Sequence, residues 1–267
     1  MIVKHNLTAM NSNRMLGLTT ATQAKSTEKL SSGYKVNRAA DDAAGLAISE
    51  KMRRQVRGLT QASANAQDGI SMVQTAEGAL NEVHDMLQRL NELAVKGENG
   101  TLTTSDRSYI NSEVQQLMSE INRVASTTTF NEKNLLVATT VALQVGAESG
   151  QHISVTLKAM DCPGLGLAGN TKTASAAGTF NASVKSAIKT LNEHRSTLGA
   201  VQNRLEHTIN NLDNIAENTQ SAESSIRDTD MALEMVSYAN NNILAQAGQS
   251  MLAQANQANQ GVLSLLG

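Results

Sequence analysis

A single proline, Pro163, occurs in the 267 residues of this chain. Proline interrupts helix interiors because it removes a backbone donor and its ring clashes with the preceding turn. Roughly the first hundred and the last seventy residues contain no proline and are rich in alanine, asparagine and glutamine. The sequence therefore permits very long helices at both ends and predicts a mainly α-helical protein.

The apolar residues are mostly small or aliphatic. Hydrophobic residues make up 40% of the chain, but aromatic residues only 2%, and tryptophan is absent. A compact enzyme core usually draws much of its burial from aromatic side chains, whereas alanine, leucine, isoleucine, valine and methionine suit the apolar stripe of a helix. The composition thus favours helices packed along seams over a compact enzyme.

The charge and the hydropathy pattern restrict the possible partners. The formal net charge is −2, so no strong electrostatic field favours nucleic acid or anionic lipid. No run of about 20 apolar residues is available to span a bilayer. The lone Cys162 excludes an internal disulfide framework. We expect no nucleic-acid partner and no membrane insertion.

The N-terminal half divides into four expected segments. A helix over 3–31 is expected to end at a C-cap on Gly33, followed by a linker over 34–42 and a short helix over 43–57. From Leu59 to Ala94 apolar residues recur at steps of three or four, which predicts one helix of about 38 residues, roughly 55 Å long. Another helix is expected over 105–127, capped by Thr104 or Ser105.

Beyond residue 130 the pattern changes from helix to strand and back. Segments 141–145 and 153–157 predict a β-hairpin, and the Gly- and Ser-rich segment 158–180 is expected to be a loop. Helices over 182–224 and from about 229 to the C-terminus meet at a joint over 226–228. The expected fold is an elongated antiparallel helical bundle rod, connected up-down-up, with a small β-hairpin and a terminal coiled-coil helix pair.

The two terminal helices are the segments that most strongly suggest assembly. Amide side chains crowd the last helix and leave a thin apolar stripe, represented by Val236, Ile243, Met251, Val262 and Leu266. Helices need tertiary packing to persist in water, so this pair would be marginal in a monomer and ordered by equivalent helices of other subunits. The alternative is an ordinary intramolecular helix pair on a monomeric protein.

Short motifs near both ends show a family resemblance. The chain resembles bacterial flagellin over about 1–135 and 182–267. The motifs that carry this resemblance lie in the N-terminal part at 30–33, 37–49, 58–63, 65–71 and 77–82, and in the C-terminal part at 198–204, 245–248, 252–257 and 262–266.

The resemblance implies a secreted structural protein that self-assembles into a helical tubular propeller, the extracellular flagellar filament used for motility. It further implies export through the flagellum's own channel, with the export apparatus and chaperone and the hook-associated and cap proteins as partners. Segments 1–36 and 229–267 would form the inner core, 37–57 a linker with a short helix, and 58–138 with 182–228 the rod. Segment 139–181 would stand in place of the variable outer domains, so the resemblance is to a minimal flagellin without them.

The resemblance also suggests two groups of functional residues. Candidates for subunit contacts are Asn37, Arg38, Asp41, Asp42 and Arg53, together with the five stripe residues of the last helix. Candidates for recognition by the mammalian flagellin receptor, Toll-like receptor 5, are Gln88, Arg89, Glu92, Leu93 and Glu113. The alternative for Arg89 and Glu113 is an interhelix ion pair near a filament contact, and both interpretations can hold together.

No pattern in the chain indicates catalysis, a cofactor or a metal. Gly164, Gly166 and Gly169 spell G-x-G-x-x-G, but a dinucleotide site needs this motif between a strand and a helix of a βαβ unit. The five histidines are scattered without metal-ligand spacing. We therefore expect no enzyme. A hook–filament junction protein or an exported adhesin remains an alternative, although 139–181 is short for a functional insert.

Overall fold

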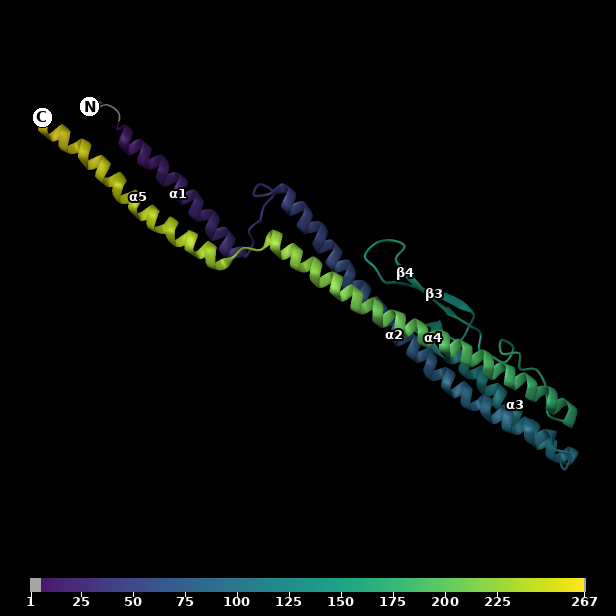
Figure 1. Cartoon of the computed structure of the whole chain (residues 1–267). Helices are drawn as coiled ribbons and strands as arrows, with labels where there is room; N and C mark the ends of the chain where they lie inside the picture. Colours follow the sequence, from purple (N-terminus) through teal and green to yellow (C-terminus); the bar gives the residue numbers. More distant parts are fainter. Residues whose placement is uncertain (1–5, 267) are drawn as a thin grey trace. The chain divides into compact units, whose positions relative to one another are not determined.

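The fold is mainly α-helical, as predicted. In the computed structural model the described residues are 6–266, and side-chain surroundings are described for 6–257. The chain forms two compact units, residues 1–54 with 218–267 (unit 1) and residues 55–217 (unit 2). The elements, labelled in Figure 1, are α1 (Leu7–Ser32), α2 (Ala43–Glu98), α3 (Thr104–Thr127), β1 (Thr129–Phe130), β2 (Lys133–Asn134), β3 (Thr139–Gln144), β4 (His152–Leu157), α4 (Ala174–Arg227) and α5 (Met231–Leu266).

In unit 1, α1 and α5 lie side by side and antiparallel (Figure 1). At one end of the pair, the side chain of Asn6 accepts from the N–H of Ala9 at 3.0 Å and donates to the carbonyl of Ala255 at 2.9 Å. At the other end, Lys29 Nζ lies 3.9 Å from Glu234. Gly33 ends α1 in the left-handed conformation, with φ 76°, and its N–H donates to the carbonyl of Lys29. The predicted terminal helix pair and C-cap are both confirmed.

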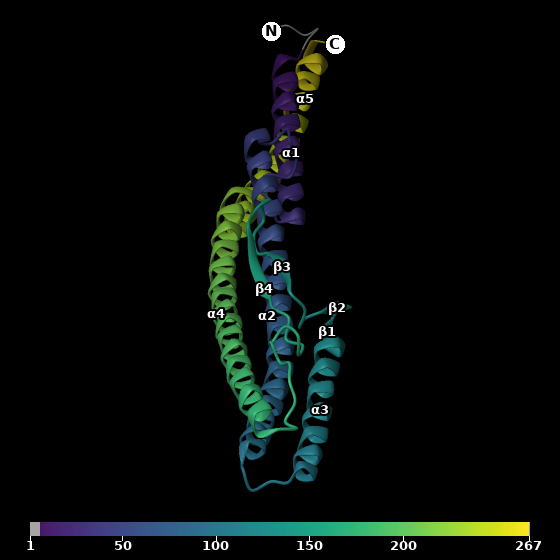
Figure 2. The same ribbon diagram turned by 90° about the vertical axis from the view of Figure 1, so that its right-hand side faces the viewer.

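In unit 2, α2, α3 and α4 lie side by side (Figure 2). Contacts between Glu98 and Asn181 and between Ser63 and Asp213 show that α4 runs antiparallel to α2. Contacts between Gly97 and Arg107 and between Arg89 and Glu113 show the same for α3. α4 therefore runs parallel to α3, and the expected up-down-up connectivity is wrong. The segment between α3 and α4 carries the chain back along the bundle before α4 begins.

The seam predicted on the long helix is the centre of the unit 2 core. Leu80, Val83, Leu87 and Leu90 are all 0% exposed. The helix itself is longer than predicted, because the short helix expected over 43–57 and the seam helix expected from Leu59 to Ala94 are one continuous helix, α2. Gly58 does not break it: a Cβ there would lie 2.8 Å from the Cβ of Ala147, so glycine allows the hairpin turn to approach the helix.

The predicted β-hairpin is confirmed. β3 and β4 pair antiparallel from Thr139 opposite Leu157 to Gln144 opposite His152. Alternate residues of β4, Ile153, Val155 and Leu157, are buried, as expected for a strand with one face on the core.

Three local predictions need correction. The sequence missed the two-residue hairpin β1–β2, whose turn is made by Asn131 and Glu132 with positive φ. α4 begins at Ala174, earlier than the expected residue 182. The N-cap of α3 is Thr103, whose side chain forms a capping box with Asp106.

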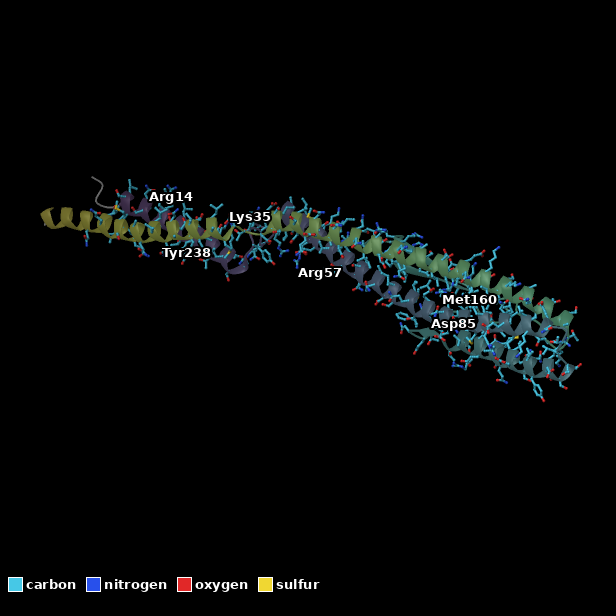
Figure 3. The ribbon with its side chains drawn as sticks, turned by 60° about the horizontal axis from the view of Figure 1, so that its bottom comes forward. Arg14, Lys35, Arg57, Asp85, Met160 and Tyr238 are labelled. Carbon is cyan, nitrogen blue, oxygen red and sulfur yellow. The ribbon has the colours of Figure 1, made fainter. Side chains whose placement is uncertain are left out.

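Segment 158–173 is irregular, as predicted, but it belongs to the core. Met160, Cys162, Leu165, Leu167 and Thr171 are all buried, and Figure 3 shows Met160 among the helices of unit 2. The Cys162 thiol donates to the carbonyl of Met118, and burial raises its pKa to about 11. This cysteine is therefore a packed core residue.

Candidate functional surfaces

The α1/α5 pair buries very few of its described side chains. Only Ala9, Ser26 and Ala245 are buried in these two helices within residues 7–257. Small residues also set the spacing at Gly248, where a Cβ would lie 3.3 Å from the Leu16 side chain. The two helices thus approach each other closely along small residues, and the contact removes little apolar area from water.

Most of the large apolar side chains of the pair face outward instead. We call them the pair surface; their exposed fractions lie between 47% and 67%, and they are Leu7, Met10, Met15, Leu18, Met231, Leu233, Met235, Val236, Ile243, Leu244 and Met251. Side chains project from both helices in Figure 3, in which Arg14 of α1 and Tyr238 of α5 are labelled. The thin stripe expected on the last helix is therefore too narrow a description, because Leu233, Met235 and Leu244 join it.

The structure places three of the five predicted stripe residues on this surface. Val236 is 58% exposed, Ile243 64% and Met251 59%. Val262 and Leu266 belong to α5, but their side chains lie outside the described residues.

The candidate residues in 37–53 make contacts within the chain. Glu28 accepts from the Asn37 amide at 2.8 Å and from Arg38 Nε at 2.7 Å. The Asp41 carboxylate accepts the backbone N–H groups of Asn37 and Arg38. The hydrogen bond from Arg38 is the main cause that lowers the pKa of Asp41. These bonds give the segment before α2 a defined shape.

The other two candidates of this segment act on α2 itself. Asp42 Oδ1 accepts the N–H groups of Ala44 and Gly45, which satisfies free donors at the start of the helix. Arg53 pairs with Glu50 one turn away at 2.8 Å.

Arg227 joins several segments of unit 1, and the sequence analysis did not identify it. Its Nη1 donates to Glu50 at 2.8 Å, and its guanidinium lies 4.4 Å from the centroid of the Tyr34 ring. Its carbonyl accepts the N–H groups of Lys35 and Val36. The bond from Arg227 is the main cause that lowers the pKa of Glu50. The sequence marked only a joint over 226–228, because the partners of Arg227 are far away along the chain.

Four of the five candidate receptor residues lie on one exposed region of α2 and α3. Arg89 donates to Glu113 on α3 at 2.8 Å and to Glu92 at 3.0 Å, and these bonds raise the pKa of Arg89. Gln88 is exposed beside them. Leu93 does not share this face, since it is 2% exposed in the core seam. The ion pair considered as the alternative for Arg89 and Glu113 is therefore present.

Comparison with models of protein families identifies the family of this chain. Residues 3–140 match the model of the bacterial flagellin N-terminal helical region, and residues 182–266 match that of the bacterial flagellin C-terminal helical region. The chain belongs to the flagellin family.

Relatives match this flagellin over their full length. The flagellin of Halalkalibacterium halodurans is 54% identical and that of Bacillus subtilis 45% identical, with 100% of both chains covered in each case. The flagellar filament 31.3 kDa core protein of Treponema maltophilum is 49% identical with the same coverage. The crystal structure of Bacillus cereus flagellin aligns with a TM-score of 0.50 at 32% identity, covering 56% of this chain and 88% of that one.

Membership decides among the functional classes considered above. Flagellins are structural proteins that polymerise into the extracellular flagellar filament, and they are not enzymes. The G-x-G-x-x-G loop at 164–169 lies outside any βαβ unit in the described structure. None of the described helices combines the length and the hydropathy that a bilayer crossing needs.

Proposed function

We propose that the pair surface is the surface through which this flagellin polymerises. Segments 1–36 and 229–267 would form the inner core of the filament, with 37–57 as the linker, 58–138 and 182–228 as the outer bundle, and 139–181 in place of the variable domains. The observation that carries this proposal is the outward orientation of the apolar side chains in a helix pair that buries almost none of them. Large exposed apolar surfaces mark interaction sites, and equivalent helices of other copies supply a matching apolar partner.

The family resemblance supports the wider setting of this function. The filament would act as a propeller for motility. The chain would be exported through the flagellar channel with the export apparatus and a chaperone, and it would meet hook-associated and cap proteins at the filament ends. A hook–filament junction role is less well supported, because relatives named flagellin match the chain over its full length.

Truncation tests the central role of α5. We expect deletion of residues 240–267 to abolish filament growth, because it removes Ile243, Leu244 and Met251 from the pair surface. Cooperative unfolding of unit 2 should persist, since its core lies within residues 55–217. A control variant replaces residues 240–267 with a helix-forming sequence of the same length that has no large apolar residues. It separates the loss of apolar side chains from the loss of chain length. Long filaments from the truncated chain would contradict the proposal.

The segment before α2 is a second element of the proposed assembly. We propose that Asn37, Arg38, Asp41, Asp42 and Arg53 present contacts to neighbouring subunits in the shape that their internal bonds define. Arg38→Ala is expected to raise the critical concentration for polymerisation, measured by sedimentation, and to leave the helical content of the monomer unchanged. An unaltered critical concentration would restrict Arg38 to a role within the monomer.

We also propose that the exposed face formed by Gln88, Arg89, Glu92 and Glu113 binds Toll-like receptor 5, with Leu93 supporting it from the core. Arg89 is held by two carboxylates, yet its side chain is 51% exposed, so its planar donors remain accessible. Receptor activation in a reporter cell should fall with Arg89→Ala. Arg123→Ala is the matched control, because Arg123 is an exposed arginine of α3 whose carboxylate partner is Glu120 and not Glu113. Equal activation by both variants would refute the assignment.

A further inference from the structure

The turn between α2 and α3 contains a dipeptide with its own chemistry. Asn99–Gly100 is the one asparagine–glycine pair in the sequence, and both residues are exposed. Neither the assembly proposal nor the receptor proposal uses it.

The side-chain and backbone carbonyl groups of Asn99 accept hydrogen bonds from different donors. The side-chain Oδ1 accepts from the N–H of Thr101 at 3.2 Å. The backbone carbonyl accepts from Arg107 Nη2 at 2.9 Å, while Arg107 Nε donates to the carbonyl of Gly97 at 3.1 Å. Within the described residues, the N–H of Gly100 donates no hydrogen bond.

We propose that Asn99–Gly100 is a site of spontaneous covalent modification, at which Asn99 is converted to aspartate and isoaspartate. The Gly100 nitrogen attacks Cγ of Asn99 and forms a new N–Cγ bond. The Cγ–Nδ2 bond breaks, and ammonia leaves with the proton that the Gly100 nitrogen loses. Solvent water then opens the resulting succinimide ring at either carbonyl, which gives aspartate or isoaspartate without any oxidant or reductant.

This attack requires stabilisation of the charge that develops on Asn99 Oδ1 and a backbone that can rotate, and the structure favours both. Negative charge develops on Oδ1 as the ring closes, and the Thr101 N–H already points at that atom, as a donor does in an oxyanion hole. Gly100 leaves the backbone free to rotate toward Cγ, because it has no Cβ and its surroundings are open.

Arg107 gives the isoaspartate product a specific partner. In isoaspartate the chain continues through Cγ, and the former backbone carbonyl of Asn99 becomes a free carboxylate. That carbonyl is the group that Arg107 Nη2 already contacts. The conversion therefore replaces a neutral acceptor by a charged one, which strengthens a hydrogen bond from a guanidinium.

The test follows the modification by mass in the full-length chain. Purified flagellin is held in warm, mildly alkaline buffer, and peptides are mapped by mass spectrometry and by methylation with an isoaspartyl methyltransferase. We expect the peptide containing Asn99 to gain one mass unit before any other asparagine peptide and to become the main methyl acceptor.

Two glycine variants test whether the geometry at Gly100 controls the rate of conversion of Asn99. Gly100→Ala fits without steric conflict, since an added Cβ meets nothing within 4 Å. It should slow conversion at least about tenfold, because alanine restricts the rotation that ring closure needs. Gly199→Ala has equally open surroundings but does not follow an asparagine, and it should leave the rate unchanged. An intact Asn99 beside deamidation elsewhere, or equal rates in the Gly100→Ala variant and the unaltered chain, would overturn the proposal.

Discussion

Replacing Ile243 by glutamine isolates the contribution of the pair surface to polymerisation. Ile243 is 64% exposed in the α1/α5 pair, so the substitution removes little packing from the monomer. Glutamine has a higher helix propensity than isoleucine. A loss of filament formation therefore cannot arise from a weaker α5.

The size of the effect follows from the exposed fraction. Complete burial of an isoleucine side chain contributes about 1.5–3 kcal/mol relative to full exposure. Polymerisation can bury only the 64% of Ile243 that is still exposed, which corresponds to roughly 1–2 kcal/mol per subunit. Since about 1.4 kcal/mol is a factor of ten in an equilibrium constant, Ile243→Gln should raise the critical concentration by about five- to thirtyfold.

Seeded polymerisation followed by sedimentation measures this critical concentration directly. Asn240→Gln is the matched control, because Asn240 is an exposed residue one turn earlier and the variant keeps an amide there. It should change neither the critical concentration nor the melting temperature. If Ile243→Gln polymerised at the original concentration, or if its monomer unfolded at a clearly lower temperature, the assignment of Ile243 to the assembly surface would be refuted.

Three further predictions concern the stability of the monomer. Leu90→Ala removes a side chain that is 0% exposed and should cost about 2–5 kcal/mol in the free energy of unfolding of unit 2, measured with urea. Burial, and then the charge of Lys158, lowers the pKa of His194 below 6.5, while Glu77 opposes this shift. As the pH falls through 6.5, His194 therefore binds a proton in the unfolded chain before it does so in the folded chain, and the stability decreases. The variant His194→Gln should flatten this part of the profile of melting temperature against pH. Gly33→Ala meets no steric conflict but must adopt φ 76°, so it should destabilise the C-cap of α1 by about 1 kcal/mol, seen as faster amide exchange in the last turn of α1.

Periodic segments were predicted well because their information is local. The seam from Leu59 to Ala94 and the alternation in β4 reflect which side of a helix or strand faces apolar surroundings. Boundaries failed where a distant residue decided them. The helix end expected at residue 57 does not exist, and only the approach of Ala147 explains why a glycine follows at position 58.

The candidate functional residues show the same contrast between local and long-range information. The sequence brought Arg89, Glu92 and Glu113 together correctly, because α2 and α3 are neighbours joined by a short turn. It misplaced Leu93, which lies on the core seam although Arg89 is only four residues away. It gave Arg227 no role, since the Tyr34 and Glu50 side chains meet it only after folding.

The sequence by itself determined that this flagellin is mainly helical, that its longest helices carry apolar seams and that both of its ends are helices. These properties follow from proline content, side-chain period and capping residues, each of which acts within a few turns of chain. Only the tertiary structure decided that α4 runs parallel to α3, that segment 158–173 enters the core and that most large apolar residues of α1 and α5 face outward. Such outcomes depend on which surfaces meet across long stretches of chain, and no local pattern of residues encodes that choice.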